Sequence, residues 1–297
     1  MSSATLAPAS PASTTAPPAP ASHGRRRRLQ HRSVIATILL AVLLLFFLLP
    51  ILYLFSVSLM GQNETGQGVL VSPNPQWTNW SDVLTQSNLL LSILNSVIAA
   101  IGGALITLLF ALPAAWAIVR YRTGGSTLSA TIMSPWLLPP IVAVVPLFTL
   151  LRIAGLNNTL LGLTVLYGLM NIPVGIWLLE GFMRKLPREL DEAAKLDGAG
   201  AFRVLVSIVT PLVAPAVVAI GIIVAILNYN EFLLATFIAP GKDTQTLPVL
   251  LSLFYGERTP HYGKIAAASI IGVIPVYAAA VLGQRWLVGG LTSGAVK

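Results

Sequence analysis

The sequence alternates long apolar runs with short polar connections. A helix needs about 20 residues to cross the roughly 30 Å of hydrocarbon in a bilayer, and six runs are long enough. Long apolar runs are also the most dependable structural signal in a single sequence. The pattern therefore predicts an all-α polytopic membrane protein with six transmembrane helices. The runs are Val34–Ser58, about Leu89–Val119, Leu128–Leu151, Leu160–Phe182, Leu205–Leu227 and Ile265–Leu287.

The third run differs from the others because it contains four prolines: Pro135, Pro139, Pro140 and Pro146. Any one of them is compatible with a tolerated kink. Irregular backbone at membrane depth, however, persists only where protein or a water-filled cavity surrounds it. We therefore expect this run to bend inside the helix bundle.

Composition agrees with a membrane protein. Hydrophobic residues make up 55% of the 297 positions and charged residues only 9%, and the mean hydropathy is +0.80. A water-soluble surface needs a larger charged fraction. The chain has no cysteine, which excludes disulfides and thiolate metal sites. Its three histidines are scattered, and no Ser/His/Asp or paired-acid arrangement suggests catalysis. We expect a non-catalytic chain that binds no cofactor or metal itself.

The Lys and Arg residues predict the orientation in the membrane. With six spans and the N-terminus inside, 14 of the 18 basic residues lie on the cytoplasmic side. The sequence therefore predicts that both termini are cytoplasmic. The run Arg25–Arg28 precedes the first span, so we interpret it as an anchor at anionic lipid rather than a nucleic-acid site. The four basic residues left outside are Arg152, Lys242, Arg258 and Lys264.

These patterns divide the chain into segments. The first 24 residues have no charge and no periodicity, which is typical of disorder. The predicted segments are a disordered Ala/Pro/Ser tail with its basic anchor (1–32), a first transmembrane helix (33–58), an extracytoplasmic loop (59–88), a core of five transmembrane helices (89–287) containing a cytoplasmic loop (184–211), and a cytoplasmic C-terminal tail (288–297).

The cytoplasmic loop is unusually charged. Between Arg184 and Arg203 lie nine of the chain's 28 charged residues. Apolar residues at helical spacing predict a short amphipathic helix, which Gly198 would end. Such a helix lies on the bilayer surface or in a groove of another protein, and its mixed charge favours a protein partner. The apolar residues are Leu186, Leu190, Ala193 and Ala194.

The stretch "EAAKLDGAGAFRVLVSIVTP" resembles the EAA loop of ABC importer permeases. That pattern reads E-A-A, three residues, Gly, nine residues, Ile, one residue, Leu-Pro, and here Thr210 replaces the usual Leu. In the family this loop is a coupling helix seated in a cleft of the ATPase subunit. The resemblance implies ATPase-coupling roles for Glu192, Ala193, Ala194, Asp197, Gly198, Ile208 and Pro211.

The resemblance covers roughly residues 33 to 297 and narrows to the carbohydrate importers of the MalG type. "YNEFLLATFI" (229–238) is similar to the family's W-N-x-F-L-x-A stretch, with Tyr229 in place of Trp. In the C-terminal stretch "QRWLVGGLTSGAVK" (284–297), Gly289 stands where Arg is common. The other similar stretches are residues 94–122 and 243–254. The resemblance implies the type I ABC importer transmembrane fold, translocating a sugar or sugar derivative by alternating access.

Partners follow from the same resemblance. The chain has no G-x-x-x-x-G-K-[ST] loop to hold phosphates, so a separate subunit must hydrolyse ATP. The resemblance implies a location in the bacterial cytoplasmic membrane, and it implies no nucleic-acid partner. The implied partners are a second homologous permease in a heterodimer, two copies of a cytoplasmic ABC ATPase carrying ATP and Mg, an extracytoplasmic sugar-binding protein and the lipid bilayer.

Candidates for substrate contact are polar residues in or beside the spans. Glu231 lies next to the fifth span, where ionisable residues are often functional, and Asn228, Tyr229 and Asn230 offer hydrogen-bonding groups beside it. An equally good interpretation is that these four hold the outer gate together. Asn171 in the fourth span is a further candidate, although a lone polar residue there more commonly bonds a neighbouring helix.

Two other classes remain as alternatives. An ion-coupled secondary transporter would carry buried carboxylates or a repeat with paired broken helices, and the runs contain few acids. An intramembrane enzyme would need a nucleophile or metal constellation, and the sequence offers none. The identity of the sugar is left open.

Overall fold

The computed structural model describes residues 23–65, 67–255 and 260–292. These residues form helices and turns without a β-strand, which confirms the all-α prediction for this part of the chain. The chain divides into two compact units, Met1–Leu52 and Tyr53–Lys297. The predicted tail up to residue 22 and the last five residues of the C-terminal tail lie outside the described residues.

Four helices in the described residues are long and apolar enough to cross a membrane, and the number rises to six if each of two bent pairs is one span. The first is α1 (His23–Ser58). It begins ten residues before the predicted boundary at residue 33, because Arg, Leu and Gln favour helix and nothing in Arg25–Arg28 interrupts it. Its apolar side chains between Val34 and Leu52 are exposed, as lipid contact requires.

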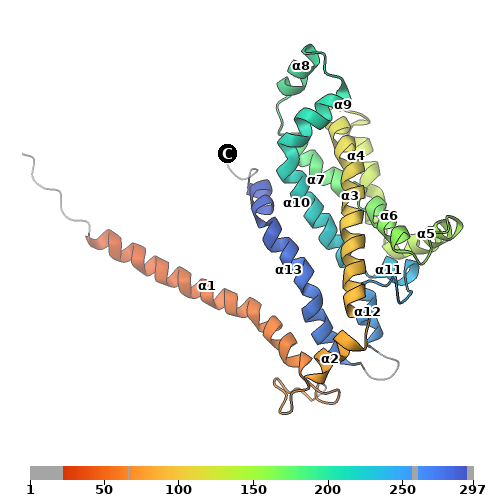
Figure 1. The fold of residues 1–297 in the computed structure, drawn as a ribbon. Helices are drawn as coiled ribbons and strands as arrows, with labels where there is room; N and C mark the ends of the chain where they lie inside the picture. Colours follow the sequence, from red (N-terminus) through yellow and green to blue (C-terminus); the bar gives the residue numbers. More distant parts are fainter. Residues whose placement is uncertain (1–22, 66, 256–259, 293–297) are drawn as a thin grey trace, which may run out of the picture. The chain divides into compact units, whose positions relative to one another are not determined.

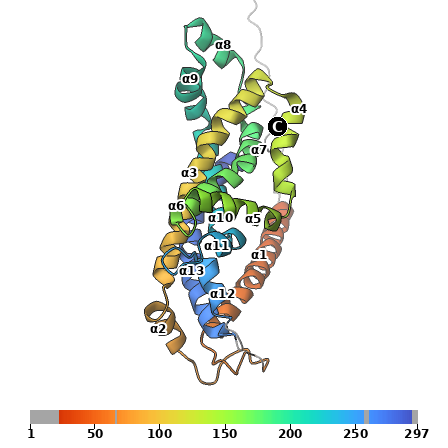
Figure 2. The ribbon, with the colours of Figure 1, turned by 90° about the vertical axis from the view of Figure 1, so that its right-hand side faces the viewer.

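The other three long helices belong to the second unit. They are α3 (Leu89–Tyr121), α10 (Thr210–Tyr229) and α13 (Tyr262–Thr292). Helix α3 packs against α10 and against the two shorter helices α6 (Leu160–Met170) and α7 (Ile172–Met183), while α13 packs on α10 (Figures 1 and 2).

Small residues allow α3 to approach its neighbours closely. A Cβ on Gly103 would lie 2.7 Å from the amide nitrogen of Asn228 and 2.9 Å from Cβ of Tyr167. The Thr107 hydroxyl donates to the backbone carbonyl of Gly168 at 2.8 Å. Small side chains and interhelical hydrogen bonds are how helices associate in membranes, where burial against lipid supplies little driving force. Helix α3 is therefore held along much of its length by α6, α7 and α10.

The third apolar run is a broken helix, as its prolines predict. It forms α4 (Gly125–Met133), the 3₁₀ turn η1 (Ser134–Leu137) and α5 (Pro140–Ile153). The two halves are bent by 90°. The bend lies at the surface of this chain rather than among its helices, because Leu137 next to it is 83% exposed. The expectation of a bend is confirmed, and the expectation that this chain's own bundle encloses it is wrong.

The fourth run is also bent. Helices α6 and α7 meet at Asn171 with an angle of 43° between them. Pro173 stands in the first turn of α7, where its missing N–H leaves no intrahelical bond unmade. The fifth run, in contrast, continues without a sharp bend from Ala201 to Tyr229.

Three short helices occupy connections that the sequence pattern leaves without structure. They are α2 (Thr78–Thr85), α11 (Leu233–Ile238) and α12 (Leu247–Leu253). Helix α2 packs on the start of α13, where the Lys264 ammonium lies 2.8 Å from the Asp82 carboxylate. Helices of six to eight residues are too short to show a reliable period.

The loop 184–211 forms α8 (Glu189–Leu196), α9 (Ala201–Val204) and the π-helical turn η2 (Leu205–Val209) before α10 begins. Within the second unit, α8 lies at one end and α2 at the other (Figures 1 and 2). We call these the α8 end and the α2 end.

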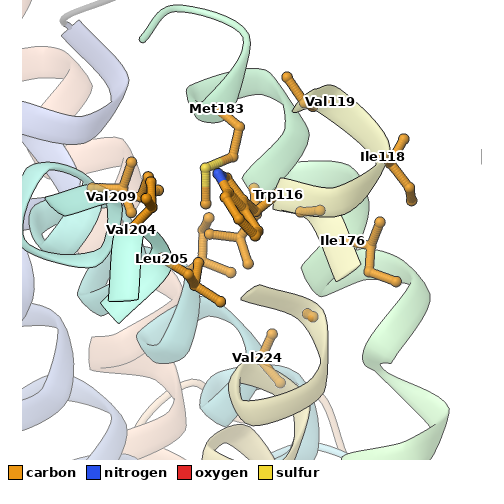
Figure 3. Close-up of a cluster of buried hydrophobic side chains, with 14 of the residues drawn as sticks. Trp116, Ile118, Val119, Ile176, Met183, Val204, Leu205, Val209 and Val224 are labelled. Atoms are coloured by element: carbon orange, nitrogen blue, oxygen red, sulfur yellow. The ribbon is translucent and has the colours of Figure 1, made fainter. Parts of the chain in front are cut away.

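A hydrophobic cluster fills the bundle toward the α8 end. Trp116 of α3, Met183 of α7, and Val204 and Leu205 at the start of the fifth run belong to it (Figure 3). Ala194 of α8 is part of the same cluster. The loop is therefore packed against the transmembrane helices rather than projecting freely from them.

Candidate functional site

The short helix predicted in the charged loop is present and ends as expected. After Leu196, Gly198 adopts a left-handed conformation with φ of 79°. Its N–H donates to the carbonyl of Lys195 at 3.0 Å, and the N–H of Ala199 donates to the carbonyl of Ala194 at 2.9 Å. This pair of bonds is the Schellman motif, which favours glycine at the left-handed position. The prediction that Gly198 ends the helix is confirmed.

One face of α8 is buried against the end of α3. The buried residues are Asp191 and Ala194. The Arg120 guanidinium, in the last turn of α3, forms an ion pair with the Asp191 carboxylate. It also donates to the carbonyls of Leu186 at 3.1 Å and Pro187 at 3.2 Å. Helix α8 and the residues before it are thus attached to α3 by one arginine.

The apolar stripe expected on α8 is divided. Ala194 is buried, Leu186 is half-buried, and Leu190 and Ala193 are exposed. Adjacent helical residues point about 100° apart, so Ala193 and Ala194 cannot share one narrow face. The pairing with Arg120 turns Asp191 inward, and Ala194 lies three residues further on the same side. The prediction of a single apolar stripe is therefore wrong.

The opposite face of α8 is open. Four of the residues predicted to couple to an ATPase lie on it or in the turn that follows: Glu192, Ala193, Asp197 and Gly198 are all exposed. Two large apolar side chains of the same loop are also exposed, Leu196 of α8 by 90% and Phe202 of α9 by 79%. Exposed apolar side chains that gather within a charged loop are typical of an interaction surface.

Ile208 and Pro211 do not lie on α8. Ile208 is half-buried in the π-helical turn, and Pro211 is exposed in the first turn of α10. The wide turn has a local cause, since the ring of Pro211 crowds the carbonyl of Ser207, four residues earlier. In this turn the N–H and the hydroxyl of Thr210 both donate to the carbonyl of Leu205. These two motif positions shape the entry into α10.

The polar residues at the end of α10 mostly join helices to one another. The Asn228 amide donates to the carbonyl of Ala100 in α3 at 3.2 Å and accepts from the Asn171 amide at 2.8 Å. The Tyr229 hydroxyl donates to the carbonyl of Gly272 in α13 at 2.8 Å. Asn230 is exposed and donates back to its own helix.

Glu231 is half-buried, and hydrogen bonds within the chain hold its carboxylate. The Tyr167 hydroxyl donates to it at 3.0 Å. The backbone N–H groups of Leu234 and Ala235, in the first turns of α11, donate to it at 2.9 and 3.1 Å. This position stabilises a carboxylate, because the N–H groups at the start of a helix lack intrahelical partners. Glu231 therefore connects α6 to α11.

A cavity opens where the two bent runs and Glu231 meet. Its volume is about 330 Å³, and most of its wall is apolar. Asn171 and Glu231 are the polar exceptions, and the Trp136 ring lies at the bend between η1 and α5. Of the candidates predicted from the sequence, Asn171 and Glu231 line the cavity, whereas Asn228, Tyr229 and Asn230 do not. The lining residues are Pro135, Trp136, Leu138, Pro140, Leu169, Met170, Asn171, Pro173, Glu231 and Leu234.

Sequence reasoning missed two ion pairs toward the α8 end, Glu180 with Arg184 and Arg120 with Asp191. Glu180 is buried within α7, where its carboxylate lies 2.7 Å from the Arg184 guanidinium and accepts from the Ser129 hydroxyl at 3.0 Å. The spacing of Glu180 and Arg184 by four residues is a helical ion-pair signal that could have been found. The pair of Arg120 and Asp191 gives no such signal, because the two residues are far apart in sequence.

No group of three or more His, Cys, Asp or Glu side chains that could hold a metal ion occurs in the part of the chain that the structure describes. Two features of the described residues are the strongest candidates for function, namely the exposed face of α8 and the cavity beside Asn171.

Comparisons with known proteins agree on one family. The model of the family "Binding-protein-dependent transport system inner membrane component" matches residues 107–292. The trehalose transport system permease protein SugB of Mycobacterium tuberculosis is 32% identical over 91% of this chain and 98% of its own length. The melibiose/raffinose/stachyose import permease protein MelC of Bacillus subtilis is 29% identical over 89% of this chain and 96% of its own.

A solved structure has the same fold. It is the crystal structure of a bacterial ABC transporter involved in the import of the acidic polysaccharide alginate, matched with a TM-score of 0.69 and 22% identity. The match covers 87% of this chain and 97% of that chain. The predicted ABC importer permease fold is therefore confirmed at the level of the helical architecture.

Proposed function

Because the chain belongs to the binding-protein-dependent transport system inner membrane components, we propose that it is a sugar permease whose loop 184–211 docks on a separate ATPase. The chain is a multi-pass membrane protein and a non-catalytic permease subunit of an ABC transporter. Its family assembles with an ATPase and a substrate-binding protein. Sugar as the substrate class is supported by relatives named for trehalose and for melibiose, raffinose and stachyose.

The two faces of α8 carry the proposal of docking. One face is attached to α3 through Asp191, the other exposes Ala193 and Leu196, and Phe202 of the following helix α9 is also exposed. A helix that is attached to its own chain on one face and exposed on the other can transmit the movement of a bound partner to the transmembrane helices. Large exposed apolar side chains within a charged rim suit a groove on that partner. We assign ATPase contact to Glu192, Ala193, Asp197, Leu196 and Phe202.

The remaining motif residues support this surface without forming it. Gly198 makes the turn that positions Phe202 relative to α8, and Ala194 allows α8 to lie close to its own chain. Ile208 and Pro211 determine how the loop enters α10. Their proposed role in coupling is to transmit movement rather than to touch the ATPase.

The cavity beside Asn171 is the proposed place of this chain in the sugar pathway. Sugars offer hydroxyl groups for hydrogen bonds and apolar ring faces for aromatic contact. The Asn171 amide, the Glu231 carboxylate and the Trp136 ring supply both kinds of contact in an otherwise apolar cavity, which is typical of small-molecule sites. Asn228 and Tyr229 act differently, since they tie α10 to α3 and α13.

A second homologous permease is the proposed neighbour. The bent third run exposes Leu137, Val142 and Val145 by 83, 65 and 71%. Bent backbone inside a membrane requires protein or a water-filled cavity around it, and a partner permease would supply this and close the cavity. In the proposed assembly, two ATPase copies bind ATP and Mg, and a sugar-binding protein delivers the sugar outside. The proposed site of assembly is the bacterial cytoplasmic membrane.

In this assembly each bent pair is one span, so six helices cross the membrane and both termini are cytoplasmic. Closing of the ATPase dimer would move α8, and the bundle would then open its cavity alternately to either side. The ion-coupled alternative draws some support from the two broken spans. Those breaks are in consecutive runs, however, rather than at matching positions of two repeats.

The test is transport by the complete complex in proteoliposomes. We expect sugar uptake with ATP and the binding protein, and loss of uptake when the ATPase subunit carries a change that abolishes hydrolysis. An ionophore that dissipates ion gradients should leave uptake unchanged. Uptake that persists without a working ATPase and stops with the ionophore would instead establish the secondary transporter.

A further inference from the structure

Arg120 is placed to control the position of α8. Only 7% of the Arg120 side chain and 8% of the Asp191 side chain are exposed. Arg120 reaches three partners in the loop, namely the Asp191 carboxylate and the carbonyls of Leu186 and Pro187. A guanidinium suits this arrangement because its donors form a rigid planar fork.

A buried ion pair is not needed for stability alone. Removing two charges from water costs much of what their attraction returns, so a pair of apolar residues is often as stable. What these contacts add is direction, because the ion pair to Asp191 and the two hydrogen bonds to the carbonyls of Leu186 and Pro187 fix the start of α8 in one orientation on α3. A second contact lies beside it, where the Lys195 ammonium is 5.3 Å from the centre of the Tyr121 ring.

We call the contacts of Arg120 with Asp191, Leu186 and Pro187 the clamp. Helix α3 connects the clamp to the α2 end of the bundle. With 33 residues it extends about 50 Å at 1.5 Å per residue. Near the α2 end, the Asn95 amide donates to the carbonyls of Asp243 and Gln245 at 2.9 and 3.1 Å. The Ser96 hydroxyl accepts from the N–H of Leu247 at 2.8 Å. A single helix thus holds α8 at one end and residues 243–247 at the other.

From these contacts we infer that Arg120 and Asp191 are positioning residues that deliver the movement of α8 to α3. The inference rests on the proposed function, since it presumes that an ATPase moves α8. Helix α3 then carries the displacement to the segment 243–247 at the α2 end. The pair acts through the helices and touches neither sugar nor nucleotide.

The experiment compares Arg120→Gln with Arg120→Lys, Asp191→Asn and the double variant Arg120→Gln/Asp191→Asn in the complete transporter. We expect Arg120→Gln to lower sugar uptake per ATP hydrolysed several-fold while the ATPase still co-purifies. Arg120→Lys should restore part of the coupling because it keeps the charge. The double variant should be no worse than Arg120→Gln, since residues that act as one pair are not additive.

A second readout examines the clamp without transport. The chain has no cysteine, so Ala194→Cys introduces one thiol at a buried position of α8. In the complex this thiol should react slowly with a water-soluble maleimide. Adding Arg120→Gln should raise the rate about tenfold or more, because a lost hydrogen bond to a charged group changes an opening equilibrium by roughly that factor.

The matched control is Arg122→Gln, which removes a guanidinium two residues away at an exposed position. It should change neither coupling nor labelling. Unchanged labelling in Arg120→Gln would overturn the clamp, and faster labelling with normal coupling would overturn the transmission. If Arg120→Gln does not accumulate, Arg120→Lys and Asp191→Asn decide by the same measurements. A wild-type complex in which sugar does not stimulate ATP hydrolysis would refute the proposed function instead.

Discussion

At the scale of single residues, two glycines of the same loop show how backbone angle separates a required glycine from a replaceable one. Gly198 has φ of 79°, whereas Gly200 has φ of −69°. A Cβ added to either one would meet no atom within 4 Å. Space is therefore equal at the two sites, and only the left-handed backbone at Gly198 resists a side chain.

We predict that Gly198→Val disturbs the turn after α8, while Gly200→Val does not. The left-handed conformation costs a non-glycine residue roughly 1–2 kcal/mol, and more for a β-branched one. The displaced turn would move Phe202 relative to α8. The measurement is sugar-stimulated ATP hydrolysis and uptake at equal membrane content of the two variants. Equal coupling in both would show that the turn does not contribute to docking.

At the scale of elements, α8 places two neighbouring alanines in different environments. Ala194 is 6% exposed and belongs to the cluster around Trp116, whereas Ala193 is exposed. The EAA pattern treats both as one unit. The structure assigns Ala194 to packing within this chain and leaves Ala193 free for a partner.

We predict that Ala194→Leu and Ala193→Leu fail in different ways. Overpacking a buried site costs about 1–3 kcal/mol, so Ala194→Leu should lower the thermal stability of the permease subunit in detergent. Ala193→Leu should leave that stability unchanged and weaken co-purification of the ATPase. A loss of stability in both variants would mean that α8 has no free face.

At the scale of the whole molecule, the charged loop belongs to the same end of the bundle as the end of α3 that carries Arg120. The other end holds α2 and the segment 243–247, tied to α3 through Asn95. The basic residues that the loop 184–211 contributes predict that the α8 end faces the cytoplasm.

We predict that a reporter active only in the cytoplasm works when fused after Lys297 and is inactive when inserted at Asn74. Asn74 is exposed between α1 and α2, so an insertion there should not disturb packing. A reporter active only outside should give the opposite result at each site. A Lys297 fusion that is active outside would overturn the six-span arrangement.

The amino-acid sequence by itself determines the helical class, the positions of the apolar runs, the bend in the third run and the turn at Gly198. These features depend on hydropathy and on the backbone preferences of proline and glycine, which act over a few neighbouring residues. The EAA loop is likewise a local pattern. For the same reason its residues could be found without a structure.

Only the tertiary structure decides how those elements use their residues. In the sequence, Asp191 is one of several charged residues in the loop. Only the structure shows that it forms an ion pair with Arg120, which is distant in sequence. In the sequence, Asn228 and Tyr229 fit a sugar contact and a structural role at the outer gate equally well. The structure shows their bonds to α3 and α13, while Asn171 and Glu231 line one cavity. Contacts between distant segments depend on helix packing, and no local period in the chain records which side of a short helix will face its neighbour.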